Sequence, residues 1–207
     1  MRYESRGNLK FIHLGLIIAL IGAAVAAATE ADMYKGYELP PYEVVGAEGE
    51  VELRSYEPHI LAQVQVSGRQ GQAVSRGFQV LANYIFGGNS AGEKIAMTVP
   101  VGQAATTDDA RLWTVSFMMP GAFDLDTLPD AKSDSIRFVE TGREDLLVVK
   151  FSGFRNPAAL SKRTDQIVAE AARQGYEIAG PPRYFFYDGP MTPPWARRNE
   201  VALPIVR

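Results

Sequence analysis

One face of the helix that we predict over residues 70–86 carries side chains suited to a flat apolar ligand. Arg76, Val80 and Asn83 lie three or four residues apart, on the side opposite the predicted core face, with Tyr84 on the flank. A guanidinium pairs carboxylates in bidentate fashion, and small or apolar neighbours leave room for a planar ring system. A solvated helix face with one arginine gives the same pattern, so both interpretations stay open.

A second candidate lies in the proline-rich loop over residues 190–201, before the final strand. Trp195 offers a stacking plane, and Arg197 or Arg198 could meet an anionic group. A loop that packs Trp195 on the protein core fits the same residues equally well.

His59 is the one histidine outside the N-terminal segment, which contains His13. Imidazole is the commonest protein ligand for metals and the commonest proton carrier, so His59 is a candidate haem ligand. An isolated, exposed histidine without such a role is the alternative. The chain has no cysteine, which excludes thiolate metal sites, covalent haem attachment and cysteine nucleophiles.

Two short motifs resemble catalytic or metal sites without their structural context. Residues 88–92 match G-x-S-x-G, but a helix enters this loop and a strand leaves it, the reverse of a nucleophile elbow. Residues 124–129 begin like a calcium loop, but Leu128 and Pro129 replace an oxygen ligand and a glycine. We therefore predict a protein that is not an enzyme.

The elements that must position these residues follow one pattern twice. Each half reads strand-strand-helix-strand-strand, with a helix whose apolar residues recur at i, i+4, i+7 and i+11. The first helix has Val74, Phe78, Leu81 and Ile85 at this spacing, and the second has Leu160, Thr164, Ile167 and Ala171. The predicted strands cover residues 50–56, 60–66, 94–101, 112–118, 135–140, 146–151, 183–187 and 200–206.

This pattern favours an α+β fold in which two joined antiparallel sheets are covered by two helices. Asn156 and Pro157 are typical of a helix start, and Gly175 of a helix end. The half-repeats extend over about residues 50–119 and 135–206 of one domain, residues 42–207.

The N-terminal residues 1–31 form a separate segment. Three basic residues precede an uncharged stretch over residues 11–28, from Phe11 to Ala28, which ends in alanines. This predicts a secretory signal peptide, with an uncleaved membrane anchor as the alternative. Either one places the domain outside the cytoplasm, in the periplasm or on the outer face of the inner membrane. The net charge of −3 and pI of about 5.5 argue against a nucleic-acid partner.

Seven motifs, in this order, resemble the SOUL family of haem-binding proteins. They are YEV, LRSY, YIFGGN, KIAMTVPV, VSFMMP, FSGF and RRNEV, and they extend from Tyr42 to the C-terminus. The resemblance implies a distorted antiparallel β-barrel flanked by two helices, with a pseudo-twofold axis between its halves. It also implies a haem or related tetrapyrrole in a shallow apolar groove beside the first helix.

Carried onto this chain, the resemblance adds Met97 to the site formed by Arg76, Val80, Asn83, Tyr84, Trp195, Arg197 and Arg198. Ser55 stands where one branch of the family has a histidine proposed to ligate iron. Other members are thought to hold porphyrin by apolar and arginine contacts alone. We therefore expect haem binding without an assured iron ligand, His59 being the only candidate.

The function that we predict is an exported, non-catalytic haem carrier or scavenger whose protein partner is unknown. One alternative is a binding module for another apolar ligand, and another is an accessory subunit tethered to a membrane complex through residues 11–28. An enzyme acting on a tetrapyrrole or a hydrophobic ester, with Glu or Tyr as its acid–base group, is a third.

Overall fold

A computed structural model describes residues 33–106 and 111–207, and the predicted signal or anchor segment lies outside them. Within these residues, no helix is long and apolar enough to cross a membrane. The helices are α1 (Gln70–Ile85), α2 (Pro157–Gln174) and the short 3-10 helix η2 (Pro194–Ala196). The strands are β1 (Met33–Tyr34), β2 (Tyr37–Glu38), β3 (Tyr42–Glu48), β4 (Val51–Tyr56), β5 (Ile60–Ser67), β6 (Val101–Ala105), β7 (Leu112–Met118), β8 (Ile136–Glu140), β9 (Glu144–Phe151), β10 (Glu177–Ile178), β11 (Arg183–Phe186) and β12 (Asn199–Val206).

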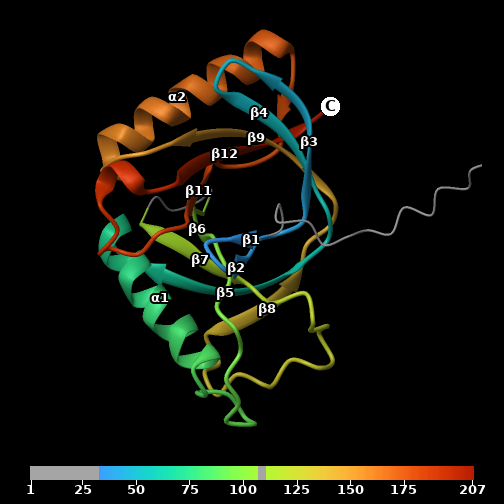
Figure 1. Cartoon of the computed structure of the whole chain (residues 1–207), viewed down its shortest axis with the longest axis vertical. Coiled ribbons are helices and arrows are strands. Elements are labelled where there is room, and N and C mark those ends of the chain that lie inside the picture. Colours follow the sequence, from blue (N-terminus) through green and yellow to red (C-terminus); the bar gives the residue numbers. More distant parts are fainter. Residues whose placement is uncertain (1–32, 107–110) are drawn as a thin grey trace, which may run out of the picture.

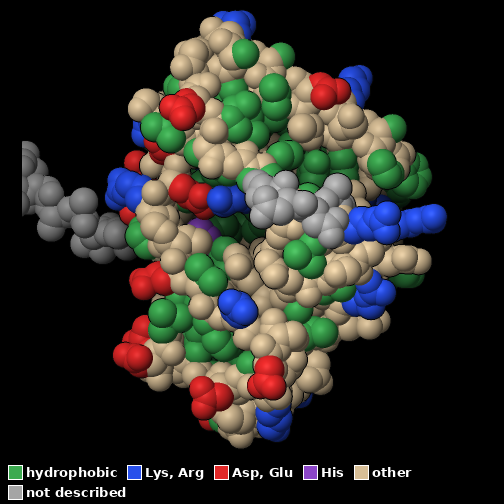
Figure 2. Space-filling view, turned by 180° about the vertical axis from the view of Figure 1, so that it is seen from behind, with side chains coloured by type: hydrophobic (Ala, Val, Ile, Leu, Met, Phe, Trp, Pro, Cys, Tyr) green, Lys and Arg blue, Asp and Glu red, His purple; other side chains and the backbone are tan. Residues whose placement is uncertain are grey.

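The main sheet is antiparallel and curls into a half-barrel, with α1 and α2 on its outer side (Figure 1). Its strand order is β3-β4-β9-β12-β11-β6-β7-β5-β8, and β10 pairs with β12. The predicted half-repeats interleave in this sheet, because strands of residues 50–119 pair with strands of residues 135–206 at β4–β9, β11–β6 and β5–β8. Figure 2 shows that the molecule is hollowed near the middle of the face seen from behind. The α+β class is confirmed, whereas the pseudo-twofold repeat stays a prediction.

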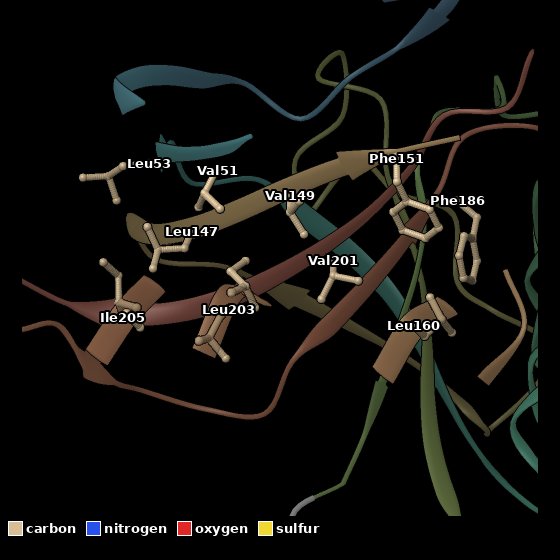
Figure 3. Packing of buried hydrophobic residues seen from close by; sticks show 12 residues of the cluster. Val51, Leu53, Leu147, Val149, Phe151, Leu160, Phe186, Val201, Leu203 and Ile205 are labelled. Atoms are coloured by element: carbon tan, nitrogen blue, oxygen red, sulfur yellow. The ribbon is translucent and has the colours of Figure 1, made fainter. Parts of the chain in front are cut away.

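The α2 half has a continuous apolar cluster (Figure 3). Leu160, Ile167 and Ala171 of α2 are buried at the positions that the helical period predicts. The Asn156 side chain accepts a hydrogen bond from the amide of Ala159, and Gly175 takes the left-handed conformation that ends the helix. The buried α2 side chains pack against the outer faces of β4, β9, β11 and β12. These faces carry Val51, Leu53, Leu147, Val149, Phe151, Phe186, Val201, Leu203 and Ile205.

In the other half, α1 packs closely on β5 and β7, and this corrects one prediction. Gly77 is the contact point, because a Cβ there would lie 2.6 Å from Cγ2 of Val115. So close an approach leaves no room for a bulky side chain beneath the helix axis. Phe78, which we expected in the core, lies at the side of the helix, 39% exposed and edge-on to the Phe117 ring.

The strand predicted over residues 94–101 is wrong for most of its length, since β6 begins only at Val101. Residues 94–100 do not form a strand of the main sheet; their backbone contacts α1 and β2 instead. The amide of Ile95 donates to the carbonyl of Ile85 at the end of α1, and the amide of Val99 donates to Glu38 of β2. Burial does not alternate along this segment, because Thr98, Val99 and Pro100 are all buried, and its pairing is limited to isolated bridges of Lys94 and Thr98.

Candidate functional site

A pocket of about 450 Å³ lies beside the C-terminal half of α1. Arg76, Val80, Asn83 and Tyr84 line it together, so the structure brings together the four residues that the helical spacing groups on one face. Four further residues complete the wall, and the sequence analysis did not single them out: Gln79 and Gly88 at α1, and Ser133 and Ile136 at β8. Side chains of an edge strand and a helix thus enclose the space between them.

The turn after α1 fixes the end of the pocket. Gly88 lies so close to α1 that a Cβ there would be 2.6 Å from the carbonyl oxygen of Asn83 and nearer still to its side chain. Asn89 is fully buried, and its side-chain amide donates to the carbonyls of Tyr84 (3.0 Å) and Glu93 (2.7 Å). Its Oδ1 accepts from the Glu93 amide at 3.0 Å. The YIFGGN motif therefore shapes this turn.

Tyr84 forms the apolar floor of the pocket. Its ring lies 5.3 Å from that of Phe138, and its hydroxyl donates to the carbonyl of Pro129 at 2.8 Å. Burial, followed by the negative charge of Asp130, raises the pKa of Tyr84 to about 12. The side chain is therefore a neutral phenol at physiological pH, and because it is only 1% exposed it backs the pocket from within the core.

Arg76 supplies the positive charge at the rim. One of its terminal nitrogens donates to the carbonyl oxygen of Ser67, which orients the guanidinium against the end of β5. Among residues 33–106 and 111–207, no carboxylate lies within ion-pair distance of it. The other nitrogens remain available to an anionic group at the mouth of the pocket.

The remaining predicted residues do not line this pocket. Met97 is partly buried against the core beneath α1. Trp195 is 79% exposed on η2, and Arg197 donates to the carbonyls of Thr192 (2.7 Å) and Pro190 (2.8 Å). His59 lies in the connection between β4 and β5, where its Nδ1 is 2.8 Å from the carbonyl oxygen of Glu57.

Arg198 belongs to a buried ionic cluster that the sequence analysis missed. Its guanidinium donates to the fully buried Glu200 at 2.7 Å and lies 4.0 Å from the centre of the Tyr187 ring. Arg54, 1% exposed, pairs with the same carboxylate at 3.0 Å, and Tyr187 donates to it at 2.7 Å. The motifs LRSY and RRNEV, far apart in the sequence, meet here on the inner face of the sheet.

Two positive charges hold the buried carboxylate ionised. Burial alone would raise the pKa of Glu200, but the charges of Arg54 and Arg198, with hydrogen bonds from Arg54 and Tyr187, lower it overall. Burial, together with the charge of Glu200, raises the pKa of the Tyr187 hydroxyl well above its usual value. The one signal in the sequence was Glu52, Arg54 and Tyr56 alternating with apolar residues of β4, which places them on the face opposite α2.

This arrangement suits binding better than metal chemistry. Among the described residues, no group of three or more His, Asp or Glu side chains is placed to hold a metal ion. The pocket lining has no histidine or methionine, and its one phenol is neutral. Its residues fit the edge and faces of a planar apolar ring with acidic substituents, but they offer no group typical of an iron ligand.

The described residues form a curled antiparallel half-barrel with two outer helices, and a pocket lies at the side of one helix. Residues 37–204 match the family described as SOUL heme-binding protein, and the chain belongs to that family. No curated protein matches the chain.

Solved structures with the same fold are distant in sequence. The C-terminal domain of EcmrR is 11% identical with a TM-score of 0.61, covering 80% of this chain and 98% of that one. A hydrolase from Listeria innocua is 12% identical with a TM-score of 0.55, covering 78% and 94% respectively. An uncharacterized conserved protein from the same organism is 13% identical, also with a TM-score of 0.55, covering 76% and 92%. These similarities show the fold alone.

Proposed function

We propose that this protein binds haem or a related tetrapyrrole in the pocket beside α1 and acts as an exported, non-catalytic carrier or scavenger. Membership of the SOUL family supports the ligand class. The observation that carries the proposal is the pocket of about 450 Å³, which has an apolar floor and one arginine without an ionic partner among the described residues at its rim.

The macrocycle would be held by its faces and edge. Val80 would provide apolar contact, with the buried Ile136 and Tyr84 behind it, and the burial of such surface is the main source of affinity for apolar ligands. Arg76 would meet a propionate, a charge-assisted contact that also fixes the orientation of the ring. The iron itself receives no contact in this proposal, because the lining holds no imidazole, thioether or ionised phenol.

Titration of the purified protein with haemin tests this function. We expect a saturable change of the Soret band with a dissociation constant below about 10 μM, equivalent to ~7 kcal/mol. Because the ring is bound and not the iron, iron-free protoporphyrin should bind with an affinity within roughly threefold of that of haemin. Absence of saturable binding of either compound would refute a carrier role.

Paired arginine variants locate the site. Arg76→Ala should weaken haemin binding by about 1.5–3 kcal/mol, the worth of a hydrogen bond to a charged group. Arg69→Ala is the matched control, since Arg69 precedes α1, carries the same charge and does not line the pocket. Equal losses in the two variants would show a general effect of charge and not a contact at this pocket.

A further inference from the structure

Three large apolar side chains project from two adjoining connections at one end of the half-barrel. They are Phe154 (67% exposed), Met191 (93%) and Trp195 (79%), here named the apolar tip. The amide of Gly153 donates to the carbonyl of Pro194 at 2.8 Å, which holds the two connections together. In Figure 1 the red connection between β11 and β12 lies beside the start of α2.

The local chain presents these side chains to solvent instead of folding them inward. Pro190, Pro193 and Pro194 restrict the backbone on either side of Met191 and before Trp195. Arg197 bonds to two carbonyls of the same loop, which closes it on itself. Single exposed apolar residues are normal on a protein surface, but an ordered group of three needs a reason.

Two arginines flank the apolar tip without a carboxylate partner. Within the described residues neither Arg155 nor Arg197 forms an ion pair. Burial and the positive charge of Arg197 lower the pKa of Arg155, and the nearest acid, Asp188, is itself paired with Lys35 at 2.6 Å. An anion at this place would relieve the repulsion between the two guanidinium groups.

The sequence puts the apolar tip within reach of a membrane. Lys35, in the β1–β2 turn, is 2.6 Å from Asp188 and 3.5 Å from the carbonyl of Ala196, so this turn touches the connection that carries Trp195. Four residues, and hence five Cα–Cα steps, separate Ala28, where the uncharged stretch ends, from Met33. Such a link spans at most about 18 Å, so a stretch 11–28 inserted in a bilayer would keep β1 close to the lipid surface.

We propose that the apolar tip, with Arg155 and Arg197, docks on the surface of a bilayer that contains anionic lipids. Trp195, Met191 and Phe154 enter the interfacial region, where tryptophan is enriched in membrane proteins, and the guanidinium groups meet lipid phosphates. The chain as a whole is acidic, so contact through this cationic place also fixes how the domain faces the membrane. The proposal does not depend on haem binding.

Tryptophan quenching in vesicles tests the contact with the full-length chain. Trp113→Phe leaves Trp195 as the only tryptophan, and the vesicles contain lipids brominated on their acyl chains. We expect the emission of Trp195 to shift to shorter wavelength and to be quenched strongly. The matched control replaces both natural tryptophans by phenylalanine and carries Phe86→Trp, at the end of α1, where Phe86 is 63% exposed. Quenching of Trp195 no stronger than in this control would overturn the proposal.

Further measurements separate the charge contribution from the apolar contribution, and a bilayer from a second copy of the chain as the binding partner. Quenching of Trp195 should be stronger with phosphatidylglycerol mixed into phosphatidylcholine than with phosphatidylcholine alone, and Arg155→Gln should remove that difference. Met191→Asp, at a position too exposed to affect folding, should reduce the quenching severalfold and leave haemin affinity unchanged. Protection of Trp195 from aqueous iodide without any quenching by brominated lipid would refute the bilayer contact and indicate a second copy of the chain.

Discussion

The two helices cover the same curled sheet, yet one flank is closed and the other is open. Beside α2, Arg163 pairs with Glu50 at 3.1 Å and Arg173 pairs with Glu48 at 2.5 Å, so the β3–β4 hairpin is tied to the helix. Beside α1, which packs on β5 and β7, the sheet ends at β8, the strand next to β5. No further strand lies beyond it in the sheet order, and the space at this edge is the pocket.

The comparison shows that a pocket can form where the edge of a sheet is left uncovered, without a special set of side chains. In α2, long apolar side chains fill the interface with the sheet. In α1, Gly77 and Ala73 bring the helix close to the sheet, Tyr84 is buried against Phe138 of β8, and Val80 stays partly exposed at the pocket. The helix therefore has apolar surface left over for a ligand.

The largest expected effect concerns the ionic cluster on the inner face of the closed half. Glu200→Gln should lower the free energy of unfolding by about 3–5 kcal/mol, because it removes the buried charge shared by Arg54 and Arg198 and leaves Arg54 only the partly exposed Glu52. Urea unfolding followed by circular dichroism measures this. Glu170→Gln, which removes a partner of the exposed Arg173 on α2, should cost much less. Similar losses in the two variants would show that burial of the cluster is unimportant for stability.

The same carboxylate gives a prediction for pH. The folded-state pKa of Glu200 lies below its unfolded value, so its contribution is complete above the unfolded pKa of about 4.3 and is lost as pH falls through the folded pKa. Stability of the wild type should therefore fall on acidification below about pH 4 more steeply than stability of Glu200→Gln, which has no charge to lose at this position. Urea unfolding at several pH values measures the free energy of unfolding of both proteins. If it fell equally steeply with pH below about 4 in the wild type and in Glu200→Gln, the prediction would be contradicted.

A smaller effect tests the close approach of α1. Gly77→Ala should destabilise the protein by about 1–3 kcal/mol, because the new Cβ would meet the side chain of Val115 at 2.6 Å. Gly71→Ala, in the same helix with nothing within 4 Å of the added Cβ, should stabilise it by about 0.5–1 kcal/mol. Thermal unfolding measures both effects. A change of the melting temperature in the same direction in both variants would contradict the close contact of Gly77 with the sheet.

The sequence predicts the elements well wherever one residue decides the local structure. Asn156 caps α2 and Gly175 ends it as expected, and β7 begins and ends at the predicted residues. The segment over residues 94–100 shows the limit, because its alternation resembles a strand while its amides bond to α1 and β2. A periodic pattern suggests a strand, but it does not report which partners the backbone amides bond to.

The candidate site divides in the same way. Helical spacing alone groups Arg76, Val80, Asn83 and Tyr84, because residues three and four apart share a face. Contacts between distant segments have no such rule, so the pairing of Arg54 with Arg198 through Glu200 could not be foreseen. The residue types of its loop suggest Arg198 as an anion contact, and its place in a buried cluster is visible only in three dimensions.

The smallest expected effect concerns His59, which lies outside the pocket. Its Nδ1 is 2.8 Å from the Glu57 carbonyl oxygen and 3.2 Å from the Thr141 hydroxyl, and the backbone amide of His59 donates to the same hydroxyl at 3.0 Å. These contacts join the β4–β5 connection to the turn between β8 and β9. We infer a local structural role for this imidazole.

His59→Ala should accordingly leave haemin affinity within about a factor of two, or ~0.4 kcal/mol, of the wild type, with the same Soret spectrum. Arg76→Ala is the comparison, because it acts inside the pocket and should weaken binding at least tenfold by the argument from charge-assisted hydrogen bonds. An axial ligand would behave in the opposite way, since its removal changes the coordination of iron and hence the spectrum. A large spectral change in His59→Ala, with Arg76→Ala near wild type, would therefore place the haem at the β4–β5 connection and not beside α1.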